Sequence, residues 1–263
     1  MEDSKALSGR KYSGIVICIA FAIMFILADS IMGIYFGGVI YHVIKSALMI
    51  LFFVVELFVY LRFYDKESAG EIIYTKDFLK GIKAGFAIFL YIPFVIVTYF
   101  VVGKPAFANT TIPIVLSYLV LEQLAVSIFE EFSFRVFVCE GYFLEDDKTS
   151  VKRFEYALVS AVTFGLTHAA TATTLNSAAI RFCMEAVWGF AFAAVYLYSH
   201  NILAAMLLHF LTDVVINSTN LIKEWTPSNL MTILDNYGYF VVMGIILAMS
   251  VIVILRQPER LTQ

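Results

Sequence analysis

Long apolar runs are the feature that most constrains this chain. They lie at 14–32, 39–61, 82–102, 112–138, 156–174, 180–199, 201–218 and 237–255, and about 20 apolar residues are what a helix needs to cross a bilayer. Of 263 residues, 61% are hydrophobic and 15% charged, against about 45–50% and about 25% in soluble domains. We therefore predict one all-α, polytopic membrane domain over residues 1–263, a bundle of about eight transmembrane helices.

The distribution of cations predicts the orientation of these spans. Loops on the cytoplasmic side of a membrane are enriched in lysine and arginine. One set of alternate loops and ends carries 13 of the 18 cations, namely Lys5, Arg10, Lys11, Arg62, Lys66, Lys76, Lys80, Lys83, Lys148, Lys152, Arg153, Arg256 and Arg260. The opposite loops hold Lys45, Lys104, Arg181 and Lys223. We expect both termini to be cytoplasmic, and an even number of spans, which puts both ends on one side, agrees with this.

Several classes of protein are disfavoured by composition. A net charge of −3 excludes a broad basic face for nucleic acid. The cysteines, Cys18, Cys139 and Cys183, are far apart and form no CxxC pair, which argues against a disulfide framework or a structural metal. The tripeptide 20–22 (AFA) lies inside the first run, so we expect a retained helix instead of a cleaved leader.

The fourth run carries the densest group of charges, in the sequence Phe129-Glu130-Glu131-Phe132-Ser133-Phe134-Arg135. Ionisable groups in the membrane interior are costly, and each needs a reason to be there. Glu131 and Arg135 are i,i+4 on a helix and predict an ion pair. Glu130 points about 140° away from Arg135 and is left for a partner across the bundle. The alternative is an interfacial cluster whose side chains reach the aqueous phase.

Two other runs carry polar groups at helix-interior positions. His168 follows Phe164 by four residues, and His209, Asp213 and Asn217 form one stripe at i,i+4 spacing. Each alone has an ordinary explanation, a hydrogen-bonded core histidine or a polar seam between helices. Together with the two carboxylates they predict a polar intramembrane cavity equipped for peptide hydrolysis. Phe164, Asn217 and Glu122 are candidates for its lining.

The remaining charges in apolar runs have simpler interpretations. Arg181 and Glu185 are i,i+4 and are expected to neutralise each other. Asp29, Glu56 and Glu140 lie near the ends of predicted spans.

Three motifs, Glu130-Glu131-x-x-x-Arg135, Phe164-x-x-x-His168 and His209-x-x-x-Asp213, resemble in order and placement those of the CPBP family of CAAX proteases and bacteriocin-processing (Abi) proteins. The resemblance covers a core of about 110–218 and implies an eight-helix intramembrane glutamic protease of a bacterial plasma membrane. Its substrate is a peptide or the tail of a membrane-associated protein, cleaved from the cytoplasmic side, and no cofactor or metal is implied.

The resemblance also implies roles for these residues. Glu130 with His168 would activate the water, and His209 with Asp213 would stabilise the oxyanion. Glu131 and Arg135 would orient the site or contact the substrate. Many bacterial members have glycine after the motif arginine, where this chain has Val136; this difference affects packing more than chemistry.

Asp213 stands where the family has asparagine or aspartate, and an ionised carboxylate cannot donate to an oxyanion. Either burial keeps Asp213 protonated, or Asp213 accepts from His209 and makes that ring the donor. We favour the second, in which one imidazole nitrogen contacts Asp213 and the other faces the cavity.

Three alternatives to this glutamic protease remain open. The first is a non-catalytic membrane module, such as a bacteriocin self-immunity factor or a regulator of a sensor kinase. The second is a proton-coupled transporter, although no inverted repeat is visible. The third is a zinc enzyme that uses His168, His209 and a glutamate. The sequence contains no HExxH, GxGD or GxSxG motif for another intramembrane protease chemistry.

Overall fold

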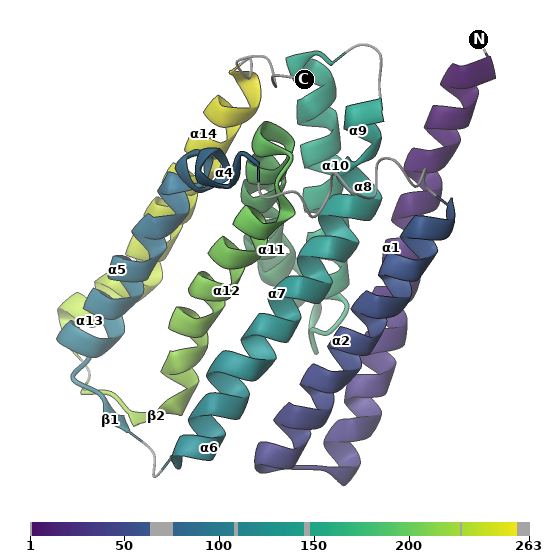
Figure 1. The fold of residues 1–263 in the computed structure, drawn as a ribbon. Helices are drawn as coiled ribbons and strands as arrows, with labels where there is room; N and C mark the ends of the chain where they lie inside the picture. Colours follow the sequence, from purple (N-terminus) through teal and green to yellow (C-terminus); the bar gives the residue numbers. More distant parts are fainter. Residues whose placement is uncertain (1, 64–75, 108–109, 145–147, 227, 257–263) are drawn as a thin grey trace.

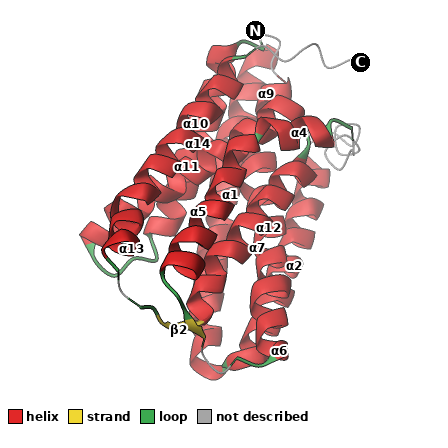
Figure 2. Cartoon of the chain, turned by 90° about the vertical axis from the view of Figure 1, so that its left-hand side faces the viewer, coloured by secondary structure: helices red, strands yellow, loops and turns green. Residues whose placement is uncertain are grey.

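The computed structural model describes residues 2–256 except 64–75, 108–109, 145–147 and 227, and it does not describe the side chains of residues 2–12, 63 and 144. Most of the described chain is helical, and the helices run roughly alongside one another in an elongated bundle (Figures 1 and 2). The α-helices are α1 (Glu2–Tyr35), α2 (Gly38–Phe63), α4 (Phe78–Ala84), α5 (Tyr91–Val95), α6 (Ile112–Val115), α7 (Gln123–Glu131), α8 (Phe137–Cys139), α9 (Gly141–Leu144), α10 (Ser150–Ala169), α11 (Leu175–Ser199), α12 (Ile202–Ser218), α13 (Asn229–Ile233) and α14 (Tyr239–Leu255).

Shorter helical turns link several of these elements. The 3₁₀ turns are η1 (Phe86–Leu90) and η5 (Thr219–Leu221), and the π-helical turns are η2 (Ile96–Val102), η3 (Leu116–Glu122), η4 (Phe132–Val136) and η6 (Leu234–Gly238). Strands β1 (Ala106–Phe107) and β2 (Ile222–Glu224) pair antiparallel. This small sheet lies at the end of the bundle opposite both termini (Figure 1).

The prediction of an all-α polytopic membrane protein is confirmed. Six described helical segments are long and apolar enough to cross a membrane: Ser13–Tyr35, Gly38–Arg62, Ile112–Phe143, Leu175–Ser199, Ile202–Leu221 and Asn229–Leu255. A bent pair, Phe78–Ala84 with Phe86–Val102, adds a seventh if it is one span. Helix α10 is 20 residues long but carries Lys152, Arg153 and Glu155 in its first turns. The count of eight and the orientation therefore stay predictions.

The predicted boundaries differ from the structure in three places. The run at 156–174 was expected to be helical throughout, but α10 ends at Ala169. The run at 82–102 is bent by 57° around Gly85, where a Cβ would lie 2.3 Å from a Leu208 methyl. Lys45 was assigned to a loop, whereas it lies inside α2. Of the cations used for orientation, Lys66 and Arg260 and the side chains of Lys5, Arg10 and Lys11 lie outside the described part.

Both chain ends lie at the same end of the bundle (Figure 1). An even number of crossings gives this arrangement. The cysteines are free, with Cys18 and Cys139 buried and Cys183 exposed.

Local capping fixes the helices that carry the motifs. Thr149 caps α10 by accepting from the Lys152 amide, and Thr174 caps α11 in a reciprocal capping box with Ser177. Asn201 caps α12 by accepting from the Ala204 amide at 3.0 Å. The preceding His200 adopts a left-handed conformation with φ of 51°, so α11 reverses into α12 within two residues.

The contact between α10 and α11 depends on glycine. A Cβ at Gly189 would lie 2.9 Å from the Phe164 Cβ and 3.0 Å from the Ala161 Cα. Real Cβ atoms do not approach this closely without a shift, and small residues are how membrane helices reach such contacts. Gly189 therefore fixes where α10 holds Phe164 and, one turn later, His168.

Candidate active site

The two adjacent carboxylates of the first motif occupy the last turn of α7. The next residues form the π-helical turn η4 (Phe132–Val136), a distortion common at functional sites. The two side chains diverge, as helix geometry predicts. Glu131 is fully buried, whereas Glu130 is 15% exposed and lines a cavity.

Glu131 is held by Arg135, in the ion pair expected from their spacing. The Arg135 Nε and one terminal nitrogen donate to the two Glu131 oxygens at 3.0 and 3.2 Å, and the other donates to the Ser160 hydroxyl at 2.6 Å. The guanidinium also lies over the rings of Phe164 and Phe192, at 5.2 and 5.9 Å from their centroids. Arg135 is thus buried, and each of its three guanidinium nitrogens donates a hydrogen bond. An arginine inside a membrane requires such partners.

His209, on α12, contacts carboxylates through both ring nitrogens. Its Nδ1 lies 2.9 Å from a Glu131 oxygen, and its Nε2 lies 3.2 Å from Asp213 and 3.8 Å from Glu130. The ring stacks on Phe192 with centroids 4.8 Å apart. The expected contact with Asp213 is present. The expectation of a second nitrogen free to face the cavity is wrong, because Glu131 occupies it.

His168, near the end of α10, faces Glu130 from the opposite side. Its Nε2 lies 3.7 Å from Glu130 Oε1. Its Nδ1 lies 2.9 Å from the carbonyl of Phe164, and the Phe164 ring lies 4.3 Å from the imidazole. Because a carbonyl only accepts, Nδ1 is the donor in this contact, and Nε2 is the nitrogen that faces Glu130.

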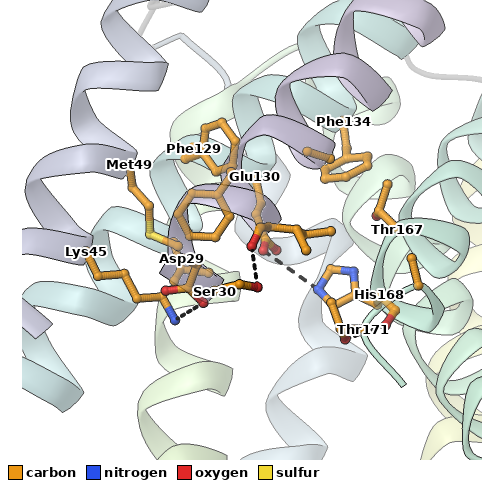
Figure 3. A pocket seen from close by; sticks show the side chains of 15 residues that line it. Asp29, Ser30, Lys45, Met49, Phe129, Glu130, Phe134, Thr167, His168 and Thr171 are labelled. Carbon is orange, nitrogen blue, oxygen red and sulfur yellow. Dashed lines mark hydrogen bonds and ion pairs between the residues drawn. The ribbon is translucent and has the colours of Figure 1, made fainter. Parts of the chain in front are cut away.

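Two cavities lie beside this group. The large cavity, of about 470 Å³, is lined by Glu130, His168 and Phe134 together with residues of α1 and α2 (Figure 3). The aromatic cavity, of about 120 Å³, is lined by Tyr91, Phe164, Glu185, Trp188, Phe192, His209, Thr212, Asp213, Ile216 and Tyr239. Glu130 lines the large cavity and His209 lines the aromatic cavity, and these two side chains lie 3.8 Å apart.

The structure separates the other lining candidates. Phe164 lines the aromatic cavity. Asn217 lines neither cavity, contrary to expectation; it accepts from the Tyr118 hydroxyl at 3.0 Å and donates to Gln123 at 3.1 Å, in a polar seam between α12 and the α6–α7 segment. Glu122 also lies outside both linings and contacts His42 at 2.5 Å and Lys45 at 3.1 Å.

Sequence reasoning missed the polar residues that α1 and α2 contribute. Asp29 and Lys45 line the large cavity, where Lys45 Nζ lies 3.5 Å from Asp29 and 3.1 Å from Glu122 (Figure 3). A signal existed, since an acid and a lysine each stand inside an apolar run and intramembrane charges seek partners. Their distance along the chain hid the contact.

The expected pair of Arg181 and Glu185 is wrong. Arg181 donates to the Thr171 hydroxyl at 2.6 Å, while Glu185 turns to the aromatic cavity. Spacing of i,i+4 permits an ion pair without requiring it, and Arg181 lies at the exposed start of α11.

The donor atoms of the described residues do not form a metal site. Among these residues, no group of three or more histidine, cysteine or acidic side chains is arranged to hold an ion. His168 and His209 instead approach Glu130 from two sides.

Comparison with known proteins adds one finding. Residues 111–215 match the family model described as type II CAAX prenyl endopeptidase Rce1-like. The matched segment runs from the residue before α6 into α12 and contains the three motifs, so the resemblance drawn from them is confirmed at the level of the family. No curated protein and no solved structure matches the chain.

Proposed function

Because residues 111–215 of this integral membrane protein match the family model of Rce1-like type II CAAX prenyl endopeptidases, we propose that it is an intramembrane glutamic endopeptidase. It hydrolyses a peptide or the tail of a membrane-associated protein from the cytoplasmic side. One observation carries the proposal: Glu130 on α7, His168 on α10 and His209 on α12 converge with separations of 3.7 and 3.8 Å beside a large cavity.

The geometry suits activation of a water molecule between Glu130 and His168. A separation of 3.7 Å is too long for a direct hydrogen bond and is the kind of gap that a bridging water spans. Such a water donates to a Glu130 oxygen and to His168 Nε2, so its lone pairs are directed at a carbonyl in the cavity. Glu130 takes one proton as general base and later returns it to the leaving amine.

His209 is placed to stabilise the tetrahedral intermediate. Carboxylates accept from both of its nitrogens, and a ring that donates from both is an imidazolium. Its positive charge lies beside Glu130, where the oxyanion develops in a site shielded from bulk water. Preorganised charge of this kind is commonly the largest contribution to catalysis. Glu131 and Asp213 hold the ring, and Arg135 holds Glu131.

A peptidase assay tests the proposal. Purified full-length protein in liposomes is incubated with a library of short peptides, and cleavage is followed by mass spectrometry. We expect Glu130→Gln to lower turnover at least 10³-fold, because the general base is lost, while thermal stability stays within about 1 kcal/mol of wild type.

Glu56→Gln is the matched control. Glu56 is also a buried intramembrane carboxylate, accepts from Ser133 at 2.5 Å and lines neither cavity. We expect this variant to retain activity. Full activity in Glu130→Gln would refute the glutamic mechanism.

A further inference from the structure

The aromatic cavity has walls unlike those of the large cavity. Five aromatic side chains line it: Tyr91, Phe164, Trp188, Phe192 and Tyr239. Tyr91 meets Trp188 and Tyr239 edge to face, with centroids 4.9 and 5.9 Å apart, and Trp188 stacks on Phe192 at 5.6 Å. The electron-rich face of an aromatic ring attracts cations.

Two carboxylates complete this lining. Asp213 is engaged with His209 at 3.2 Å. Glu185 forms no hydrogen bond or ion pair with another residue in the described part of the chain, and it lines the cavity from α11. The lining includes neither lysine nor arginine, and its one cationic group, the imidazolium of His209, is already held by Asp213 and Glu131. A carboxylate beside aromatic walls in a membrane helix is costly without a counter-charge. We therefore expect this cavity to bind a cationic group.

The size and position of the space narrow the choice of ligand. At about 30 Å³ for each water, a volume of about 120 Å³ accommodates about four water-sized groups, which is the end of a single side chain. The cavity borders His209, which lies 3.8 Å from Glu130. A side chain held there belongs to a residue next to the scissile bond.

We propose that the aromatic cavity is a specificity subsite for a basic side chain of the substrate, with Glu185 as the counter-charge and Tyr91, Trp188 and Tyr239 as its walls. The proposal rests on the proposed peptidase function. Arginine is favoured over lysine, because a guanidinium is planar, stacks on aromatic rings and is less strongly hydrated than an ammonium.

The first test measures binding without any cleavage. Trp188 lies in the proposed subsite and Trp225 does not, so Trp225→Phe leaves Trp188 as the single tryptophan and reporter. Full-length protein in detergent is titrated with n-butylguanidinium and, as its uncharged counterpart, n-butylurea. We expect a saturable change in Trp188 fluorescence with the guanidinium alone. Equal responses to both probes, or no response to either, would overturn the subsite.

Glu185→Gln then identifies the counter-charge. We expect it to weaken n-butylguanidinium binding by about ten- to hundredfold, which is the usual effect of removing a charge-assisted hydrogen bond. Binding as tight as in the parent protein would remove Glu185 from the proposal. The comparison of the two probes needs no Glu185 variant, so it remains decisive if Glu185→Gln does not fold.

The second test uses cleavage. Once a cleaved peptide is known, its residues on each side of the scissile bond are replaced in turn by arginine, lysine or norleucine. At one of these positions we expect arginine to raise kcat/KM at least tenfold over norleucine, and Glu185→Gln to reduce that ratio about tenfold. Cleavage with no basic preference at either position would refute the subsite and leave the peptidase standing. A selective response to n-butylguanidinium without cleavage of any peptide would refute the peptidase function and leave the cation-binding site standing.

Discussion

The inner helices α7, α10, α11 and α12 and the peripheral helices α1 and α2 contribute differently to the site. The inner helices supply the groups assigned to chemistry, Glu130, His168 and His209. The peripheral helices supply one wall of the large cavity, including Asp29 and Lys45. Only 17% of the most apolar window of α1 is buried, against 39% for the segments that contain α7, α11 and α12. The difference shows that the inner group is enclosed by neighbouring helices, whereas the helices of the outer wall bury less of their surface in the bundle.

Among the variants of the inner helices, Glu131→Gln is expected to cause the largest loss of stability. Arg135 is completely buried, and Glu131 is its charged partner. Removing one member of a buried ion pair costs roughly 3–5 kcal/mol. We expect thermal unfolding in detergent to shift by that amount, with a lower yield. Glu130→Gln is the control and should stay near wild type, since the histidine nitrogens nearest to Glu130 lie 3.7 and 3.8 Å away, too far for a direct hydrogen bond. If both variants unfold alike, the two carboxylates are equivalent and the division drawn here is wrong.

His209→Ala should produce the next largest effect, on activity. Removal of a preorganised oxyanion stabiliser typically costs about 10²–10³ in rate. Because Asp213 contacts the same ring, we expect Asp213→Ala and the double variant to lose a similar amount, since groups that act as a unit are not additive. Losses that multiply in the double variant would show that the two residues act independently.

Asp213→Asn separates the two roles considered for that residue. If Asp213 orients a charged His209, asparagine loses the carboxylate and the rate falls substantially. If the site needs a neutral donor at this position, asparagine equals or exceeds wild type. The 3.2 Å contact between Asp213 and His209 Nε2 favours the first result, and kcat measured at saturating peptide decides between them.

The comparison also shows where sequence reasoning succeeds. Contacts within one helix follow from spacing, so the Glu131–Arg135 and His209–Asp213 pairs were predictable. Contacts between helices depend on rotation and register, which spacing does not fix. The Glu131–His209 bond was therefore missed, although both residues were known candidates. Long apolar runs located the helices, but not the bend at Gly85 or the π-helical turn after Glu131, which depend on packing against neighbours.

The peripheral helices were the harder case. The contacts of Lys45 with Asp29 and Glu122 bring together three elements, and no motif marks them. The Arg181–Glu185 prediction failed for the opposite reason, because spacing within one helix permits the pair, but Arg181 bonds to Thr171 instead and Glu185 faces the aromatic cavity. A charge in an apolar run predicts that a partner exists but does not identify it.

Gly189→Ala tests how tightly the inner helices are packed. An added methyl would meet Phe164 and the α10 backbone at 2.9–3.0 Å, and overpacking costs typically 1–3 kcal/mol. We expect lower stability and reduced turnover, because Phe164 and His168 share this part of α10. Gly244→Ala, on α14, is the matched control, since its added Cβ meets nothing within 4 Å. Equal effects from both would mean that the close approach is not what the glycine provides.

Lys45→Met should have the smallest effect on stability and activity. It tests the peripheral helices in the same way as the variants above test the inner ones. Lys45 lies between Asp29 of α1 and Glu122 of η3, and 17% of its side chain is exposed. The exposure places the loss between that of a surface pair and that of a buried one, at about 1–2 kcal/mol. Because the change leaves two carboxylates without their cation, combining it with Glu122→Gln should restore part of the stability in a double-mutant cycle. Peptide kcat should change less than KM, since Lys45 lines the wall of the large cavity and lies outside the Glu130–His168–His209 group. A fall in kcat as large as that of His209→Ala would mean that Lys45 takes part in catalysis. The inner and peripheral helices would then not differ in the way proposed here.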